Sequence, residues 1–230
     1  MRIPFIVVLL ICVPCATYPA AFQNLNFDSA NTNNVALLPN TLDLFGTVSD
    51  LLPGWQLSHG PFRFELIGFN IAPNPPNATL IGADDAYRRP IEGLDSVAFY
   101  SDREPNPVTG TLVPFSLRQV GDVPTEAKSI HFLNYGFSEV ELLINGSQVP
   151  LLFDGGFDHS QIHLINAEAD ISAYAGQTVE LRFTTTDSDL AGLDSIYFSN
   201  EPVPEPSVLA LLGVGAMLLF WRFCRRSRSY

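Results

Sequence analysis

The chain has 230 residues, of which 47% are hydrophobic, and a formal net charge of −12. This length suits one domain of ordinary size with targeting segments at its ends. Residues 22–202 alone contain 23 acidic and 7 basic side chains, a formal charge of −16. This charge argues against nucleic-acid binding, which depends on cationic contacts to phosphate, and against docking on anionic lipid.

Residues 1–20 have the layout of a secretory signal peptide. Arg2 supplies a positive charge, an apolar stretch follows it, and small residues come next. An uncleaved anchor helix is the alternative. Of the three cysteines, Cys12 and Cys15 lie in this segment and Cys224 lies near the C-terminus, so the domain between them has no disulfide. About 180 residues bury enough apolar surface to fold without one.

Residues 22–202 predict an all-β domain of antiparallel strands. Apolar and polar residues alternate in short runs that are separated by clusters of Gly, Pro, Asn and Asp, and no window keeps helical spacing over three turns. The runs are FRFEL (62–66), SIHF (129–132), QIHLI (161–165) and TVELRFT (178–184). Strands with one polar face predict two packed sheets, a β-sandwich.

One of these runs, FRFEL, and the further stretch VELLINGSQVPLLF (140–153) carry more specific expectations. In FRFEL the alternation places Phe62, Phe64 and Leu66 on one face of a single strand. Residues 140–153 predict a hairpin, because the dipeptide Asn145-Gly146 is favoured in a type I′ turn, where both central residues have positive φ.

One motif occurs twice, as GLDSVAFYS at 93–101 and GLDSIYFSN at 192–200. The two halves of the chain share nothing else, which disfavours a duplicated domain. We expect two strands of one sandwich that are entered through similar turns. In such turns Asp95 and Asp194 accept hydrogen bonds from nearby backbone.

No catalytic residues are recognisable. The histidines are expected at the surface: His159 and His163 have the i, i+4 spacing of a helical metal site, but on a strand they lie about 13 Å apart. The sequence contains neither an HExxH motif nor a Gly-x-Ser-x-Gly elbow. We therefore expect a non-enzymatic protein without a cofactor, with a secreted hydrolase as the less favoured alternative.

Acidic loops supply the only candidate metal ligands. Asp187, Asp189 and Asp194 carry oxygen ligands of the kind that calcium takes, although their spacing departs from the EF-hand loop. The pairs Asp84/Asp85 and Asp154/Asp158 are weaker candidates. An ordinary acidic loop is the favoured interpretation of all three.

Trp55, in LLPGWQL (51–57), is the one candidate ligand contact of the domain. A tryptophan near a loop can act as a stacking platform for a sugar. A place in the hydrophobic core is the favoured alternative.

The C-terminal segment 203–230 has three parts. The motif VPEPS (203–207) contains Pro204, Glu205 and Pro206, an apolar run fills 208–221, and arginines follow it at Arg222, Arg225, Arg226 and Arg228. We expect a membrane helix over 208–223 with a basic tail at 222–228. The 14 apolar residues of the run reach about 21 Å, short of a hydrocarbon core of about 30 Å. The arginines hold this end in the cytoplasm and leave the domain outside.

This tail resembles the PEP-CTERM sorting signal of Gram-negative bacteria. The resemblance implies recognition and processing by exosortase, a membrane transpeptidase-like protease, in an organism that builds an extracellular polysaccharide matrix. A plain type I membrane anchor is the alternative.

The domain shows a looser likeness. The stretches LLPGWQL (51–57), QVGDVPTEAKSIHF (119–132) and ADISAYAGQTVELRF (169–183) resemble exported bacterial domains with the galactose-binding-like jelly-roll fold. The combined expectation is a protein that the secretory translocon exports and that exosortase sorts to the cell surface or the matrix. A carbohydrate-binding module acting on matrix polysaccharide is the alternative function.

Overall fold

The computed structural model describes residues 20–37, 39, 43–71, 77–85, 89–100, 113–136, 138–154, 163–185 and 190–203. The strands are β1 (Ala36–Leu37), β2 (Leu44–Thr47), β3 (Gln56–His59), β4 (Phe62–Phe64), β5 (Leu66–Phe69), β6 (Asn77–Gly82), β7 (Asp95–Tyr100), β8 (Phe115–Asp122), β9 (Ser129–Gly136), β10 (Glu141–Ile144), β11 (Ser147–Val149), β12 (Leu152–Phe153), β13 (His163–Asp170), β14 (Thr178–Thr185) and β15 (Leu190–Ser199). The helical elements are short: η1 (Thr32–Asn34), α1 (Val48–Leu51) and η2 (Ser172–Tyr174). The all-β prediction is therefore confirmed for the described residues.

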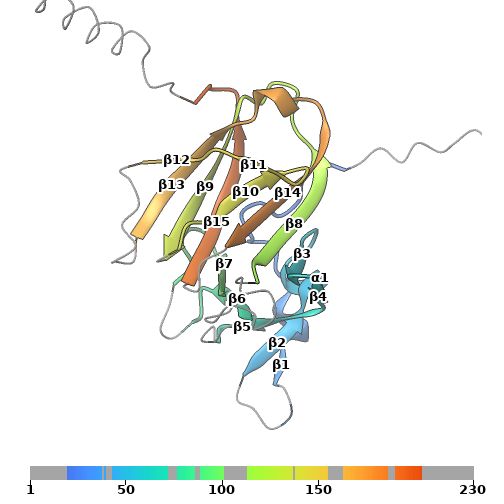
Figure 1. Ribbon diagram of the computed structural model, residues 1–230. Coiled ribbons are helices and arrows are strands. Elements are labelled where there is room, and N and C mark those ends of the chain that lie inside the picture. The colour runs from blue at the N-terminus through green and yellow to red at the C-terminus, as the bar shows by residue number, and fades with distance from the viewer. Residues whose placement is uncertain are drawn as a thin grey trace, which may run out of the picture.

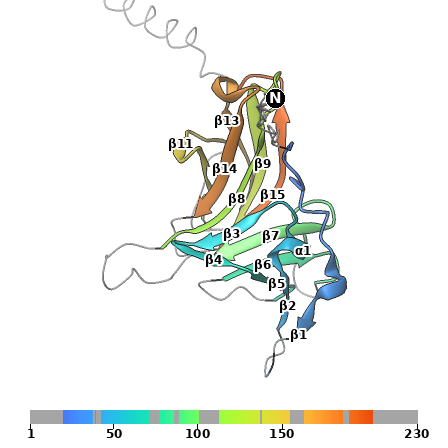
Figure 2. The same cartoon turned by 90° about the vertical axis from the view of Figure 1, so that its right-hand side faces the viewer.

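The strands form two sheets (Figure 1). The large sheet has nine strands in the order β1-β2-β5-β6-β7-β15-β9-β13-β12, and the small sheet has six in the order β11-β10-β14-β8-β3-β4. Neighbouring strands are antiparallel, with one departure from the prediction: β5 and β6 run parallel. Strands β9, β13 and β15 of the large sheet face β8, β10 and β14 of the small sheet (Figure 1 and Figure 2). Strands β1 and β2 lie at the end of the molecule away from these six strands.

The core lies between the sheets, where each contributes its apolar face. Phe132 of β9 and Phe183 of β14 meet edge to face with ring centroids 5.2 Å apart, so their contact joins the large sheet to the small one. Strand β14 shows the burial that its alternating sequence predicted. Val179, Leu181 and Phe183 are buried. Glu180 and Arg182, between them, are partly exposed. The same holds for Ile130 and Phe132 around His131.

The predicted hairpin is also confirmed. Strands β10 and β11 pair around Asn145 and Gly146, which have φ of 51° and 78°. Both central residues thus adopt the positive φ that a type I′ turn requires. The chain then leaves this hairpin, because Leu152 and Phe153 form β12 of the other sheet.

The expectation of one strand at 62–66 was wrong. The chain changes sheets at Glu65, so that Phe62 and Phe64 lie in β4 of the small sheet and Leu66 begins β5 of the large one. Strand β4 is an edge strand, which leaves Phe62 70% exposed, and Leu66 is 45% exposed. An alternating pattern does not show which sheet a residue joins. It therefore cannot show that the chain passes from one sheet to the other at Glu65.

Residues 21–28, which we call the N-terminal segment, run along one side of the sandwich. Ala21 bridges to Asp122 at the end of β8, and the backbone of Gln23 exchanges two hydrogen bonds with the side chain of Gln119. The carbonyl of Leu25 accepts a hydrogen bond from the N–H of Ile196 in β15, at 3.0 Å. The segment therefore connects β8 to β15 and delivers the residues that follow it to the middle of β15.

Candidate functional site

The two copies of the GLDS motif meet in space. Strand β7 pairs with β15, so that Leu193 lies opposite Val97. The first copy is a turn into β7, but the second lies inside β15, which corrects the expectation of two similar turns. In β15 the register with β9 shifts between Asp194 and Tyr197, and Ser195 has a φ of 50°. This irregularity turns Ile196 into the core and Tyr197 outward.

Four acidic groups gather around this irregularity. The N-terminal segment contributes Asp28, whose Oδ1 accepts hydrogen bonds from the N–H groups of Leu94, at 2.6 Å, and Asp95, at 3.1 Å. Asn26 donates to the other oxygen of Asp28 at 2.8 Å. The turn before β7 contributes Glu92 and Asp95. Asp194 of β15 completes the group.

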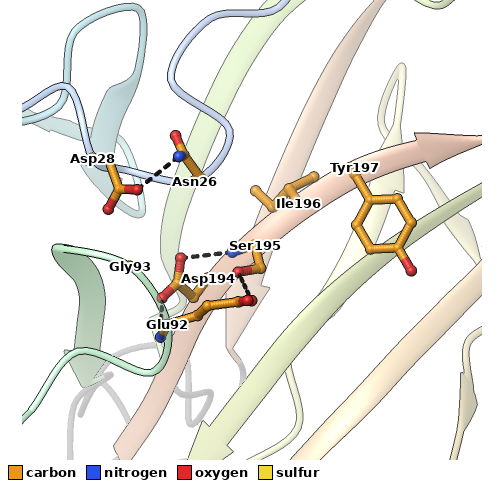
Figure 3. Close-up of a pocket in the computed structure, with 8 residues that line it drawn as sticks. All are labelled: Asn26, Asp28, Glu92, Gly93, Asp194, Ser195, Ile196 and Tyr197. Atoms are coloured by element: carbon orange, nitrogen blue, oxygen red, sulfur yellow. Dashed lines mark hydrogen bonds between the residues drawn. The ribbon is translucent and has the colours of Figure 1, made fainter.

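Asp194 is fixed by hydrogen bonds from the backbone, as the sequence predicted (Figure 3). Its Oδ2 accepts from the N–H of Glu92 at 2.9 Å, and its Oδ1 accepts from the N–H of Ser195 at 2.6 Å. The hydroxyl of Ser195 donates to Glu92 at 2.6 Å. Together with Asn26, Asp28 and Tyr197, these side chains line a hollow of about 410 Å³. We call it the acidic hollow.

Burial makes two of these carboxyl groups hard to ionise. It raises the pKa of Asp194 to about 7, partly offset by the hydrogen bonds from Glu92 and Ser195, with repulsion from Asp28 and Glu92 adding to the rise. Burial, followed by the charges of Asp28 and Asp84, raises the pKa of Asp95 to about 6. Asp194 in the hollow and Asp95 beside it therefore take up protons at higher pH than an ordinary aspartate, because burial and like charges both disfavour the ionised form.

Gly93 permits the turn that carries Glu92, and its substitution gives a first test. It has a φ of +63°, and a Cβ built there would lie 2.6 Å from both carboxylate oxygens of Asp28. We expect Gly93→Ala to lower the free energy of unfolding by about 1–3 kcal/mol, measured by urea denaturation. The matched control is Gly146→Ala, where φ is +78° but nothing lies within 4 Å. Equal losses in the two variants would contradict the proposed clash with Asp28.

A second hollow, of about 570 Å³, lies on the outer face of the large sheet. Its lining comes from β9, β12, β13 and β15 and the residue after β12: His131, Leu152, Phe153, Asp154, Asn166, Glu168 and Tyr197. A third hollow, of about 320 Å³, lies beside the end of β15 and includes Glu126, Phe198 and again Tyr197. We call the second one the outer-face hollow. Tyr197 thus borders all three.

Trp55 lies in the core. It is 4% exposed, and its ring packs against Phe27 and Phe183 with centroids 5.7 Å and 6.0 Å away. Its indole N–H donates to the carbonyl of Asn24 at 3.0 Å. Trp55 therefore has the core position that the sequence favoured, and its ring is not open to a ligand. The exposed aromatic ring beside the hollows is Tyr197.

The acidic candidates are scattered. Asp187, Asp189 and Asp158 lie outside the described residues, Asp84 and Asp154 are exposed, and Asp85 is partly exposed. Of the favoured trio only Asp194 is described, in the acidic hollow. Among the residues that the structure describes, no group of three His, Cys, Asp or Glu side chains is arranged to hold a metal ion.

The histidines are likewise separated. His59 stacks on Phe115 in the small sheet, at 5.5 Å between ring centroids, and His131 lies on the outer face of the large sheet. His163 begins β13, and His159 lies outside the described residues.

The targeting segments also fall outside the described part of the chain. This applies to residues 1–19, to Pro204, Glu205 and Pro206, to the apolar run and to the tail arginines Arg222, Arg225, Arg226 and Arg228. Within the described residues, no helix has the length and apolar character needed to cross a membrane.

The fold and the hollows define a β-sandwich domain with an acidic surface, and comparison with known proteins adds the character of the tail. Residues 202–226 match the PEP-CTERM protein-sorting motif, so the chain carries this motif at the position expected from its sequence. No curated protein sequence matches the chain.

Solved structures show a partial likeness. A structure of TmCBM61 in complex with β-1,4-galactotriose has 15% identity and a TM-score of 0.36, covering 65% of this chain and 90% of that one. The enzymatically active domain of bacteriophage CBA120 tailspike protein 4 has 7% identity and a TM-score of 0.36, covering 79% and 21%. A β-glucosidase from Kluyveromyces marxianus in complex with glucose has 11% identity and a TM-score of 0.29, covering 53% and 15%. With TM-scores this low, no ligand or activity transfers to this chain.

Proposed function

We propose that this protein is exported across the inner membrane of a Gram-negative bacterium and sorted by its C-terminal signal to the cell surface or the extracellular matrix. The observation that carries this proposal is the PEP-CTERM motif at 202–226. Residues 1–20 act as the signal peptide that the secretory translocon reads, 22–202 are the exported domain, and 203–230 are the sorting signal. The acidic, disulfide-free composition of the domain fits an exported soluble cargo.

Exosortase is the processing enzyme in this proposal. The triplet Pro204-Glu205-Pro206 stands at the outer edge of the apolar run, where a membrane protease can reach it, and the four arginines hold the other end in the cytoplasm. A run of 14 residues is short for a permanent span. The tail thus pauses the chain in the membrane until it is cut.

Intact mass spectrometry of the protein isolated from its own cells tests this proposal. We expect a mature form that lacks the apolar run and the arginines in wild-type cells, and a form that retains them in cells without exosortase. Replacing Pro204, Glu205 and Pro206 together by alanine should cause the same retention. A wild-type protein that keeps its whole tail would instead indicate a type I anchor.

For the domain we propose a jelly-roll sandwich of the galactose-binding-like kind, acting by binding rather than by catalysis. Two facing sheets of predominantly antiparallel strands support the fold. A carbohydrate-binding module is the second candidate function, and one specific observation favours it: Tyr197 is 54% exposed and borders three hollows. An open aromatic ring beside polar groups is a common way to hold a sugar.

A further inference from the structure

Tyr197 is part of a pair of stacked rings on the outer face of the large sheet. It lies directly opposite His131 across the β15–β9 ladder. The two rings are nearly parallel, with an interplanar angle of 5° and centroids 4.8 Å apart. His131 covers one face of Tyr197, while 54% of the tyrosine residue remains exposed. A large ring that is both stacked and open is a preformed platform, because little side-chain entropy remains to be lost on binding.

A hydrogen bond to His131 helps to hold this platform in place. Ser129 donates its hydroxyl hydrogen to the carbonyl of Glu201 at 2.7 Å, so the 2.8 Å contact between Ser129 Oγ and His131 Nε2 requires the histidine to be the donor. On the other side of the ring, Nδ1 of His131 lies 3.6 Å from a carboxylate oxygen of Glu168. This carboxylate attracts the ring only when the imidazole is protonated, so the hydrogen bond at Nε2 is the contact that orients the imidazole, and the imidazole supports Tyr197 by stacking.

Hydrogen-bonding groups stand beside the platform in the outer-face hollow. Asn166 and Glu168 project outward from β13, two residues apart, which places them on the same face of the strand. The turn after β12 is tied to β13, since the N–H of Asp154 donates to the carbonyl of Asn166 at 3.0 Å. Carboxylate and amide groups next to an aromatic face match the two sides of a sugar ring, its hydroxyls and its apolar C–H face.

The charges around Tyr197 select the kind of sugar. Carboxylates line all three hollows: Asp28, Glu92 and Asp194 in the acidic hollow, Asp154 and Glu168 in the outer-face hollow, and Glu126 in the third. Among the described residues that line the three hollows, none is a lysine or an arginine. A polysaccharide that bears uronate, sulfate or phosphate groups would be repelled. Because three hollows meet at the exposed ring of Tyr197, the surface suits an oligosaccharide of several sugars better than a single buried sugar.

We propose that the outer face of the large sheet binds an oligosaccharide without acidic groups. One sugar stacks on the free face of Tyr197, and its hydroxyls donate to Glu168 and bond to Asn166. This inference rests on the second candidate function, carbohydrate binding, and adds to it the site and the charge class of the ligand. It is independent of how the tail is processed.

The test measures binding of the full-length chain in detergent by isothermal titration calorimetry. The probes are cello-oligosaccharides and β-1,4-galacto-oligosaccharides as neutral glycans, chitosan oligomers as cationic ones and alginate oligomers as acidic ones. We expect at least one neutral probe to bind and alginate not to bind. Tyr197→Ala should weaken binding by about tenfold or more, Glu168→Gln should weaken it less, and Tyr197→Phe should retain it.

A matched control is Phe62→Ala, which removes another exposed aromatic ring, 70% exposed on β4 of the other sheet, and should leave binding unchanged. If a neutral glycan binds and Tyr197→Ala binds it equally well, the protein binds carbohydrate but this site is wrong. If no neutral probe binds the wild type, both the site and the carbohydrate-binding function fail. Binding of chitosan alone that 0.5 M salt abolishes and Tyr197→Ala retains would indicate charge attraction and overturn the proposal.

Discussion

Replacing Trp55 with alanine is expected to lower the free energy of unfolding by about 3–5 kcal/mol, the usual cost of removing a large buried aromatic side chain. Trp55 is 4% exposed and packs between Phe27 of the N-terminal segment and Phe183 of the small sheet. Phe183 in turn meets Phe132 of the large sheet. The substitution would therefore loosen the N-terminal segment and the contact between the sheets together.

Chemical denaturation of the full-length chain in detergent measures this loss. Trp55→Phe separates the contribution of packing from that of the hydrogen bond. It keeps most of the packing but removes the 3.0 Å hydrogen bond from the indole N–H to the carbonyl of Asn24. We expect this variant to lose about 1–2 kcal/mol. If Trp55→Ala unfolded at the same denaturant concentration as the wild type, the central place of this ring in the core would be refuted.

The positions of the strands show how much of the fold could be predicted from the sequence. Alternation in 178–184 and 129–132 predicted both the strands and their buried faces, because each lies in the middle of a sheet with one face on the core. The Asn-Gly dipeptide located the hairpin because it specifies backbone angles directly. These signals depend only on residues close in the chain.

The failures have a common cause. At 62–66 the alternation continues while the chain moves from one sheet to the other, and at β5 the partner strand is parallel. In QIHLI (161–165) the alternation predicted Leu164 on the apolar face of the strand, but Leu164 is 57% exposed and Ile165 is buried, because the core is met by the other face of β13. Pairing between strands far apart in sequence is absent from any local pattern.

The candidate site followed the same division. The repeated GLDS motif pointed to Asp95 and Asp194, and both lie in or beside the acidic hollow. Asp28 accepts a hydrogen bond from the N–H of Leu94, 66 residues away, and no sequence pattern indicated this contact. Tyr197 lay in the second copy of the motif, but its exposure depends on the shifted register after Asp194. A site built from residues far apart in the sequence could be recognised only once the fold was known.

Lowering the pH from about 7 to about 4 is expected to stabilise the domain, contrary to the usual destabilisation of proteins by acid. Asp194 and Asp95 have pKa values of about 7 and about 6 in the folded protein, against 3.8 for an ordinary aspartate. Over this range the folded state holds protons that the unfolded chain has released, so the free energy of unfolding falls as pH rises. At about 1.4 kcal/mol per pH unit, Asp194 alone contributes at most about 4 kcal/mol.

Melting temperatures across this pH range would show the effect, and Asp194→Asn should flatten the profile. The variant also turns an amide N–H toward a backbone donor, either Glu92 or Ser195, so its absolute stability is expected to fall and the slope is the quantity to compare. Asp170→Asn is the matched control, because the hydrogen bond from Ser172 lowers the pKa of that exposed carboxyl and gives it the opposite pH dependence. A wild-type melting temperature that declines steadily from pH 7 to 4 would contradict the expected stabilisation. A slope unchanged in Asp194→Asn would show that the carboxyl of Asp194 is already ionised within the fold. In that case the repulsion among Asp28, Glu92 and Asp194 must be relieved by something other than a proton.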